Sequence, residues 1–364
     1  MSGSPLSRRL VWIVALTWFA GLFACVSTRL SVEELPEAPI AFLHWEDKAA
    51  KKRAEILGAD EAPAPPAPSS SRGDPAAAEE REIEAYLQAE RSALLAFKLS
   101  KDPGRLMLYW PRSEKLERVA AAPPDSRPLA WSRDHQRLLF VSAHRGGKEQ
   151  LYEYDVQRKH LSVLTTGPLA HVRGDYDDSG RLAILGMKRS NRGGPAFRSV
   201  YIASSGGRVE TPIPADIHPG TLRFSPAGDR IVYEQVRARP RSDGATTFES
   251  FIATRSFEPG AEEEILLRGR EPSLTPDGDW IVFASPSTAG YRLRRMRPDG
   301  TSRVPIGANG PGGSDERMPS VSPDGEFIAF ILDAGDSRQL HVRRFDGKRE
   351  RSLVTDGWSE FPVW

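Results

Sequence analysis

The chain has 364 residues, with 50 Lys and Arg against 49 Asp and Glu, one Cys and 39% hydrophobic residues. This length suits a large core, because closed all-β folds often use about 250 residues or more as one domain. The low hydrophobic fraction excludes a polytopic membrane protein, and the near-neutral charge argues against a nucleic-acid-binding protein that relies on phosphate attraction. One Cys excludes an internal disulfide and a Cys-based metal cluster.

The first 25 residues have the pattern of a secretion signal. Arg8 and Arg9 precede an apolar run over residues 10–24, which is shorter than the ~20 residues that a membrane-spanning helix needs. Residues 1–24 are therefore expected to be a signal peptide. The run ends in the letters LFAC, which resemble the bacterial lipobox and predict that Cys25 is acylated, giving lasting membrane attachment. An uncleaved membrane anchor and a short buried helix are the alternatives.

Residues 25–92 are predicted to link this signal to the folded domain. Residues 46–57 are rich in Ala, Lys and Glu with few apolar positions to bury, which predicts a solvated helix. Residues 59–78 are rich in Ala, Pro and Ser, a composition typical of an extended tether. Residues 79–95 form a further candidate helix, the end of which could instead begin a strand. We therefore expect the tether to hold a domain of residues 93–364 off a membrane.

Residues 93–364 contain internal repeats. A short apolar strand, a four-residue turn and a second strand recur at spacings of 43 to 50 residues. The turns read SRDH, DDSG, SPAG, TPDG and SPDG, beginning at Ser132, Asp177, Ser225, Thr275 and Ser322. Hairpin turns typically have Ser or Asp at the first position, Pro at the second, and Gly in a left-handed conformation at the fourth. Two further strand-like segments complete each unit, and four strands per unit of about 40 to 50 residues indicate a propeller blade.

The number of repeats predicts six blades. Residues 361–364 look like the innermost strand of a blade that lacks its other strands. Residues 94–99, 106–110 and 115–119 look like the second, third and fourth strands of a blade that lacks its first. Their pairing would leave no exposed sheet edge. The predicted fold class is all-β, a six-bladed β-propeller closed by its N- and C-terminal strands and preceded by a signal peptide and a flexible tether.

The Ser-Pro-Asp-Gly hairpins, the outer Asp-Gly turns and the six units resemble the TolB family, the periplasmic propellers of the bacterial Tol–Pal envelope system. The resemblance covers about residues 93–364 and implies a WD-repeat-like, monomeric propeller that docks an envelope protein or a peptidoglycan-associated partner. This chain departs from the family, because a signal, a helix and a tether stand where TolB has a globular N-terminal domain. Val26 after the Cys resembles the outer-membrane sorting pattern, so we expect a lipid-anchored protein that faces the periplasm.

The repeats carry no motif that indicates catalysis. The Gly-x-Ser-x-Gly pentapeptide of prolyl-oligopeptidase-type hydrolases is absent from the sequence. The letters DYDDSG, beginning at Asp175, resemble the start of a calcium loop, but Gly186 stands where the bidentate Glu should be, so we favour a turn over a cation site. His160, His171 and His218 fall at different blade positions, unlike converging metal ligands. We therefore expect no enzymatic activity, metal, cofactor or nucleic-acid partner.

Charged residues just before the innermost strands are the candidate binding site, namely Arg127, His218, Arg270, Glu271, Glu316, Arg317 and Glu360. Propeller symmetry would place such positions around one mouth of the central channel, where mixed charge could bind a peptide or a sugar. The alternative is that the charges only pair with their neighbours. Two functions stay open: a non-enzymatic envelope propeller that docks a partner, and a periplasmic propeller that binds or cleaves a peptide or glycan at the channel mouth.

Overall fold

A computed structural model describes residues 29–46, 103–144, 147–167, 170–188, 197–203, 213–214, 221–240, 246–258, 260–288, 290–307, 314–335 and 337–364. The signal peptide, Cys25, nearly all of the predicted linker helices and tether, the expected strand at residues 94–99 and His218 lie outside these residues. In the described part the only helix is a 3-10 turn, η1 (Val32–Glu34). None of the described helices is both long and apolar enough to cross a membrane.

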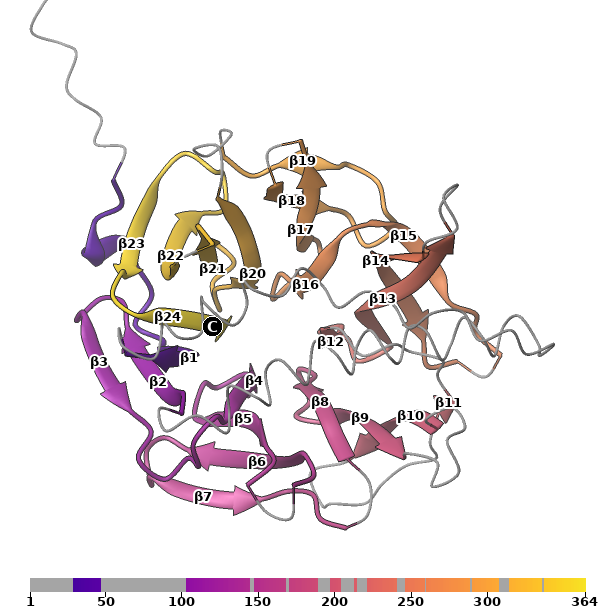
Figure 1. Ribbon diagram of the computed structural model, residues 1–364, viewed down its shortest axis with the longest axis horizontal. Coiled ribbons are helices and arrows are strands. Elements are labelled where there is room, and N and C mark those ends of the chain that lie inside the picture. The colour runs from indigo at the N-terminus through magenta and orange to yellow at the C-terminus, as the bar shows by residue number, and fades with distance from the viewer. Residues whose placement is uncertain are drawn as a thin grey trace, which may run out of the picture.

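The described strands form six antiparallel units of four, arranged around a common centre in Figure 1. Four units are separate sheets, and two share an eight-stranded sheet through a bridge between Arg338 and Trp358. Blade 2 consists of β4 (Arg127–Trp131), β5 (Arg137–Ser142), β6 (Gln150–Asp155) and β7 (His160–Val163). Blade 3 consists of β8 (Ala170–Tyr176), β9 (Leu182–Lys188), β10 (Phe197–Ala203) and β11 (Ile213–Pro214). Blade 4 consists of β12 (Leu222–Phe224), β13 (Arg230–Pro240), β14 (Thr246–Ser256) and β15 (Glu264–Arg268). Blade 5 consists of β16 (Arg270–Leu274), β17 (Ile281–Ser287), β18 (Gly290–Met296) and β19 (Val304–Pro305). Blade 6 consists of β20 (Asp315–Val321), β21 (Phe327–Asp333), β22 (Arg338–Arg344) and β23 (Glu350–Val354).

Blade 1 combines the two ends of the described chain. Its innermost strand β24 (Trp358–Val363) pairs with β1 (Ile40–Trp45), which pairs with β2 (Arg105–Trp110), and β2 pairs with β3 (Lys115–Arg118). The expected third and fourth strands are therefore confirmed. The second strand, however, is Ile40–Trp45 and not residues 94–99, because all six residues of β1 are buried between two neighbouring strands. Residues 47–102 consequently connect the second strand of this blade to the third.

The repeated turns have the backbone that their sequences predict. The fourth residue has a positive φ in four of them, at Gly180, Gly228, Gly278 and Gly325, and His135 adopts the same conformation in the SRDH turn. The first residue also acts as predicted. The hydroxyl of Ser322 accepts a hydrogen bond from the N–H of Phe327 at 2.9 Å. These local bonds fix where each innermost strand ends and the second begins.

Hydrogen bonds connect the innermost strands of neighbouring blades. The Oγ of Ser273 in β16 accepts from the N–H of Val321 in β20 at 3.2 Å. The Oγ of Ser320 accepts from the N–H of Trp364 at 2.9 Å. The innermost strands contact one another in the order β4, β8, β12, β16, β20 and β24, and β24 also contacts β4. Apolar clusters fill the space between blades, so burial and backbone pairing hold the six units together.

Residues 29–39, which we call the N-terminal strap, lie on the outer rim beside blades 1 and 6, as the indigo segment of Figure 1 shows. Leu30 and Leu35 of the strap are 1% and 0% exposed and belong to the core between these blades. The indole Nε1 of Trp364 donates to the carbonyl oxygen of Ala38 at 3.0 Å. The strap is therefore an integral part of the propeller, although the sequence predicted a linker there.

Candidate functional site

Four of the predicted site residues occupy the same position in their blades. Arg127, Arg270, Arg317 and Glu360 each stand four residues before the aligned apolar position of the repeat. In three of these strands the next residue has a positive φ and precedes a proline, namely Glu271, Met318 and Phe361. A left-handed backbone at a residue with a side chain is uncommon. The strand register shifts there, so each of these innermost strands carries a bulge at the mouth.

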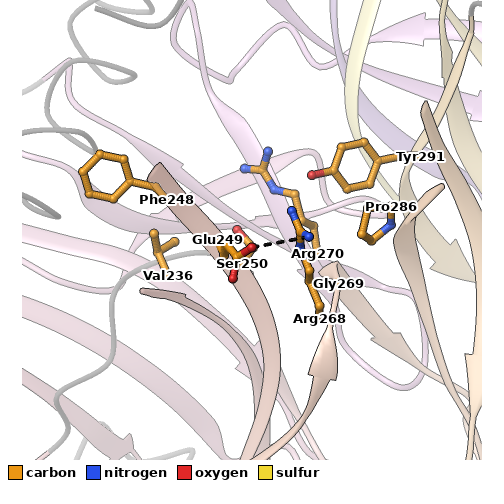
Figure 2. Close-up of a pocket in the computed structure, with 9 residues that line it drawn as sticks. All are labelled: Val236, Phe248, Glu249, Ser250, Arg268, Gly269, Arg270, Pro286 and Tyr291. Atoms are coloured by element: carbon orange, nitrogen blue, oxygen red, sulfur yellow. Dashed lines mark ion pairs between the residues drawn. The ribbon is translucent and has the colours of Figure 1, made fainter. Parts of the chain in front are cut away.

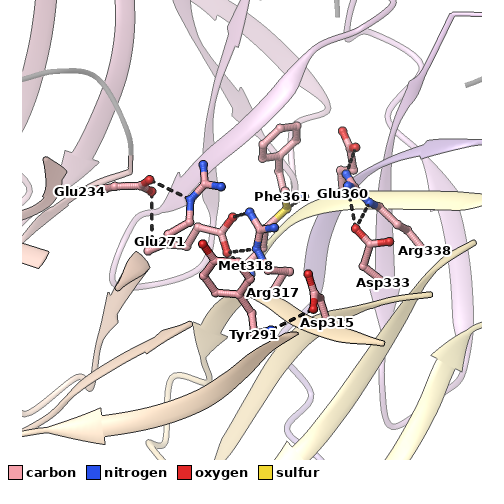
Figure 3. Close-up of polar contacts among 11 residues, drawn as sticks. Glu234, Glu271, Tyr291, Asp315, Arg317, Met318, Asp333, Arg338, Glu360 and Phe361 are labelled. Carbon is pink, nitrogen blue, oxygen red and sulfur yellow. Dashed lines mark hydrogen bonds and ion pairs between the residues drawn. The ribbon is translucent and has the colours of Figure 1, made fainter. Parts of the chain in front are cut away.

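A chain of ion pairs runs across blades 4, 5 and 6 at this level, as Figure 3 shows. Glu234 in β13 accepts from the Nε of Arg270 at 3.0 Å and from the N–H of Glu271 at 3.2 Å. Glu271 in turn accepts from the Nε and Nη2 of Arg317 at 3.1 and 2.6 Å, and from the N–H of Met318 at 2.7 Å. Each carboxylate thus binds both the arginine and the bulged N–H of the next blade.

The charges of this cluster fix its protonation. Burial opposes ionisation of Glu271, but the charge and hydrogen bonds of Arg317, together with the charge of Arg270, outweigh it and hold the pKa of Glu271 down to about 2. Burial also opposes the charge of Arg317, yet its pairing with Glu271 raises the pKa of the guanidinium. Glu271 is therefore an ionised, fully paired carboxylate at neutral pH. Such a group is poorly suited to accept or donate a proton in a reaction.

Glu316 does not join this cluster. Its side chain is buried between blades 5 and 6, where it accepts from Arg343 at 2.7 Å and from the N–H of Leu293 at 2.9 Å. Adjacent residues of a strand point to opposite faces, so Glu316 and Arg317 separate. Glu316 thus braces two blades, and the prediction that it lines the mouth is not met in this arrangement.

Glu360 is also paired inside the fold. It is 1% exposed, accepts from the Nε1 of Trp358 at 3.0 Å and forms an ion pair with Arg338. Arg338 binds Asp333 as well, at 2.6 Å. Figure 3 shows this group beside the Glu271 and Arg317 pair, with Met318 and Phe361 between them. Glu360 therefore fixes the position of β24 next to blade 6.

Arg127 lies at a separate seam, between blades 1 and 2. Its Nη2 donates to the carbonyl oxygen of Val172 in blade 3 at 3.1 Å and lies 3.8 Å from Glu149. The guanidinium stands 5.3 Å from the ring centre of Phe361, a cation–π arrangement. A small pocket here is lined by residues that include Trp45 of β1. Arg127 thus bridges three blades at the mouth.

A second and larger pocket lies between blades 4 and 5, with a cavity volume of about 100 Å³ (Figure 2). Its walls include Phe248 and Glu249 of β14, Arg268 of β15, Arg270, and Tyr291 of β18. Arg268 is 56% exposed on its side chain and lies 3.4 Å from Glu249. The pocket therefore combines arginines with aromatic rings beside a long hairpin.

The sequence did not indicate this pocket. It exists because β13 and β14 pair over eleven residues each, whereas β12 pairs with only three residues of β13. The hairpin of β13 and β14 thus continues past its own innermost strand to form one wall. The alternating letters VRAR, beginning at Val236, were the available signal for an extended strand.

The pKa of Asp175 is shifted in the opposite direction from that of Glu271. Asp175 in β8 accepts from the N–H of Phe224 at 2.7 Å and lies near Arg223. Burial raises the pKa of Asp175 to about 6, although Arg223 and two backbone N–H groups partly offset that effect. Asp177, which also belongs to the calcium-like sequence, accepts from the N–H groups of Ser179 and Arg181 at 2.9 and 2.8 Å, as a hairpin turn requires.

Among the described residues, no group of three or more His, Cys, Asp or Glu side chains is arranged to hold a metal ion. The described mouth consists instead of paired carboxylates, arginines and aromatic rings. This arrangement can present a rigid, mixed-charge surface with two pockets at its edge. Binding of a polar or acidic surface is the chemistry that it supports best.

Solved structures share this fold. TolB from Acinetobacter baumannii is 17% identical, with a TM-score of 0.57 over 100% of this chain and 74% of that one. A structure assigned as TolB from Agrobacterium tumefaciens is 22% identical, with a TM-score of 0.51 over 68% of this chain and 87% of that one. Hydrazine synthase from Kuenenia stuttgartiensis is 12% identical, with a TM-score of 0.56 over 90% of this chain and 46% of that one. No family model matches the sequence, and no curated protein shows significant similarity to it. The fold is therefore that of a TolB-like β-propeller.

Proposed function

We propose that this chain is a non-enzymatic protein of the bacterial cell envelope, and that the mouth of its propeller docks a protein partner. An acyl group on Cys25 would attach it to the membrane, with the outer membrane as the expected location. The partner would be an envelope protein or one associated with peptidoglycan. The TolB-like fold supports a docking role by analogy, since one fold can host many activities and the site must carry the argument.

The pairing of the mouth carboxylates is the observation that carries this proposal. Glu234, Glu271 and Glu360 each bind an arginine and a further N–H donor, so their oxygens are engaged within the protein. A general acid or base needs a pKa near the working pH, and the pKa of Glu271 is far below it. These residues stiffen the mouth, and a rigid surface loses little conformational entropy when a partner docks.

The pocket between blades 4 and 5 is the part of the mouth that we assign to the partner. Arg268 exposes 56% of its side chain there, in a pocket that Phe248 and Tyr291 also line. Arginine and tyrosine are enriched among the residues that dominate protein interfaces. A peptide or glycan that the protein binds or cleaves in the same pocket is the second candidate, because the pocket is concave and its walls carry arginines beside aromatic rings.

Affinity purification from cross-linked envelopes separates these functions. We expect the wild-type chain to recover one partner in stoichiometric amount and the Arg268→Glu variant to recover roughly tenfold less. Charge reversal at an interface weakens binding, and a loss of about 1.4 kcal/mol in binding free energy is tenfold in affinity. The matched control is Arg158→Glu, since Arg158 is 83% exposed on the turn between β6 and β7, at the opposite end of the strands.

The outcomes of this experiment are distinct. Equal recovery by wild type and Arg268→Glu would contradict docking at this pocket. Turnover of a peptide or glycan by the wild-type chain, lost in Arg268→Glu and kept in Arg158→Glu, would replace the docking proposal with the second candidate.

A further inference from the structure

We propose that the rim formed by the N-terminal strap, β23 and β3 lies against the membrane surface, so that the propeller is held at the bilayer and not suspended from it on a tether. This inference rests on the proposed attachment of the chain to a membrane through its N-terminal segment. The sequence predicted the opposite arrangement, with the Pro-rich residues 59–78 between anchor and propeller. The position of β1 changes that expectation.

The strap is fixed to blade 6 along its length. The N–H of Leu30 donates to the carbonyl oxygen of Glu350 at 3.3 Å, and Arg29 forms a parallel bridge with the same residue. Both terminal guanidinium nitrogens of Arg349 donate to the carboxylate of Glu34, one of them at 2.7 Å. A charge-assisted, two-point bond of this kind restricts orientation as well as distance.

The strap is also fixed to blade 1. The Nε of Arg112, in the turn between β2 and β3, donates to the carbonyl oxygen of Leu35 at 3.1 Å, and its Nη1 binds Glu37 at 2.7 Å. Leu35 is wholly buried in the cluster that also contains Trp364. Release of the strap would therefore expose core side chains of two blades. We infer that it stays in place when the protein is attached to a membrane.

The length of chain before the strap then limits how far the propeller can stand from its anchor. Cys25 is four residues before Arg29, and four residues span at most about 14 Å when fully extended. An uncleaved anchor over residues 10–24 would end one residue earlier and give nearly the same limit. Residues 59–78 cannot add to this distance, because they follow β1 in the chain.

The attachment point lies on the rim, so it also sets which side of the propeller faces the membrane. Blades 1 and 6 carry the strap, and blade 4 lies across the ring from blade 1 in Figure 1. A compact domain of about 270 residues has a radius of gyration near ~18 Å, which puts opposite rims tens of ångströms apart. The rim near Lys348 and Leu116 therefore faces the lipid surface, and the rim near Glu264 faces away from it. Leu116 is an exposed apolar residue on this rim, 42% exposed.

Fluorescence quenching by lipid headgroups tests this orientation. A bimane label is placed at Lys348→Cys, whose side chain is 80% exposed beside the strap, or at Glu264→Cys, which is exposed on β15. The acylated full-length chain is bound to vesicles of phosphatidylethanolamine and phosphatidylglycerol that contain nitroxide-labelled headgroups. We expect loss of most of the fluorescence at position 348 and almost none at position 264.

A variant with a longer link provides the matched control. Insertion of 20 Gly and Ser residues between Ser27 and Thr28 adds an r.m.s. reach of about 25 Å, so quenching at position 348 is expected to fall to the level at position 264. Persistent quenching in this variant, or equal quenching at both positions without the insertion, would overturn the proposed orientation.

Flotation of the chain with the vesicles and the mass of its mature N-terminus report the attachment itself. A chain that does not float overturns the membrane attachment in the proposed function. A chain that floats but shows no quenching at position 348 overturns only the orientation.

Discussion

Arg317 at the start of blade 6 binds both carboxylate oxygens of Glu271 in blade 5, through Nη2 at 2.6 Å and Nε at 3.1 Å. The same carboxylate accepts from the N–H of Met318, whose left-handed backbone forms the bulge at the mouth. One side chain thus holds the charge and the backbone of the neighbouring blade. The carboxylate of Glu271 is thereby engaged within the protein.

Substitution of Glu271 tests the role of this ion pair in stability. The pKa of Glu271 is lowered from 4.5 to about 2, so its contribution is fully present above pH 4.5 and is lost as the pH falls towards 2. Glu271→Gln should therefore lower the free energy of unfolding by about 3 kcal/mol at pH 7. Urea unfolding at pH 7 and near pH 2 measures the difference, which should shrink at the lower pH. An equal loss at both values would assign the effect to packing instead.

Substitution of Asp175 should change the free energy of unfolding in the opposite direction. Its pKa is raised from 3.8 to about 6, so the folded state binds the proton more tightly than the unfolded state. Ionisation of Asp175 therefore costs stability, and that cost grows as the pH rises from 4 to 6 and is complete above that. Asp175→Asn should raise the free energy of unfolding by up to roughly 3 kcal/mol at pH 7. The gain should vanish near pH 3, and a gain that persists there would contradict this account.

Shortening the chain tests the assignment of β1. His44 of β1 pairs with Arg105 of β2, so a short loop can connect the two strands. Replacement of residues 47–102 by a four-residue loop with an Asn-Gly turn should leave the thermal midpoint nearly unchanged. Phe42→Ala should cost about 3 to 5 kcal/mol, because Phe42 is wholly buried in β1. The reverse result, an unfolded deletion variant and a neutral Phe42→Ala, would place the second strand of blade 1 elsewhere.

The local elements of this fold could be predicted from the sequence, but the strand that pairs with the C-terminal strand β24 could not. The turn at Ser322 was readable because its glycine and its hydroxyl act within the same six residues. β1 was missed because a six-residue segment that is apolar at five positions shows neither the alternation of a half-buried strand nor the spacing of an amphipathic helix. Its partners β2 and β24 also lie far along the chain from it.

The structure brings some of the predicted site residues together and separates others. Arg270, Glu271 and Arg317 come together because equivalent blade positions meet at the mouth. Glu316 points between blades instead, since the neighbouring strand position faces the other way. Glu234 was not foreseen, because it stands in a second strand and its partner is in the next blade. Such contacts depend on the packing of blades, which the repeat spacing alone does not specify.

Site-specific photo-cross-linking tests the docking proposal most directly. Benzoylphenylalanine replaces Phe248 in the pocket between blades 4 and 5, or Arg158 on the opposite face as the control. Irradiation of intact envelopes should give one discrete protein adduct from position 248 and none from position 158. An adduct from position 158 alone, or no adduct from position 248, would contradict docking of a protein at the mouth.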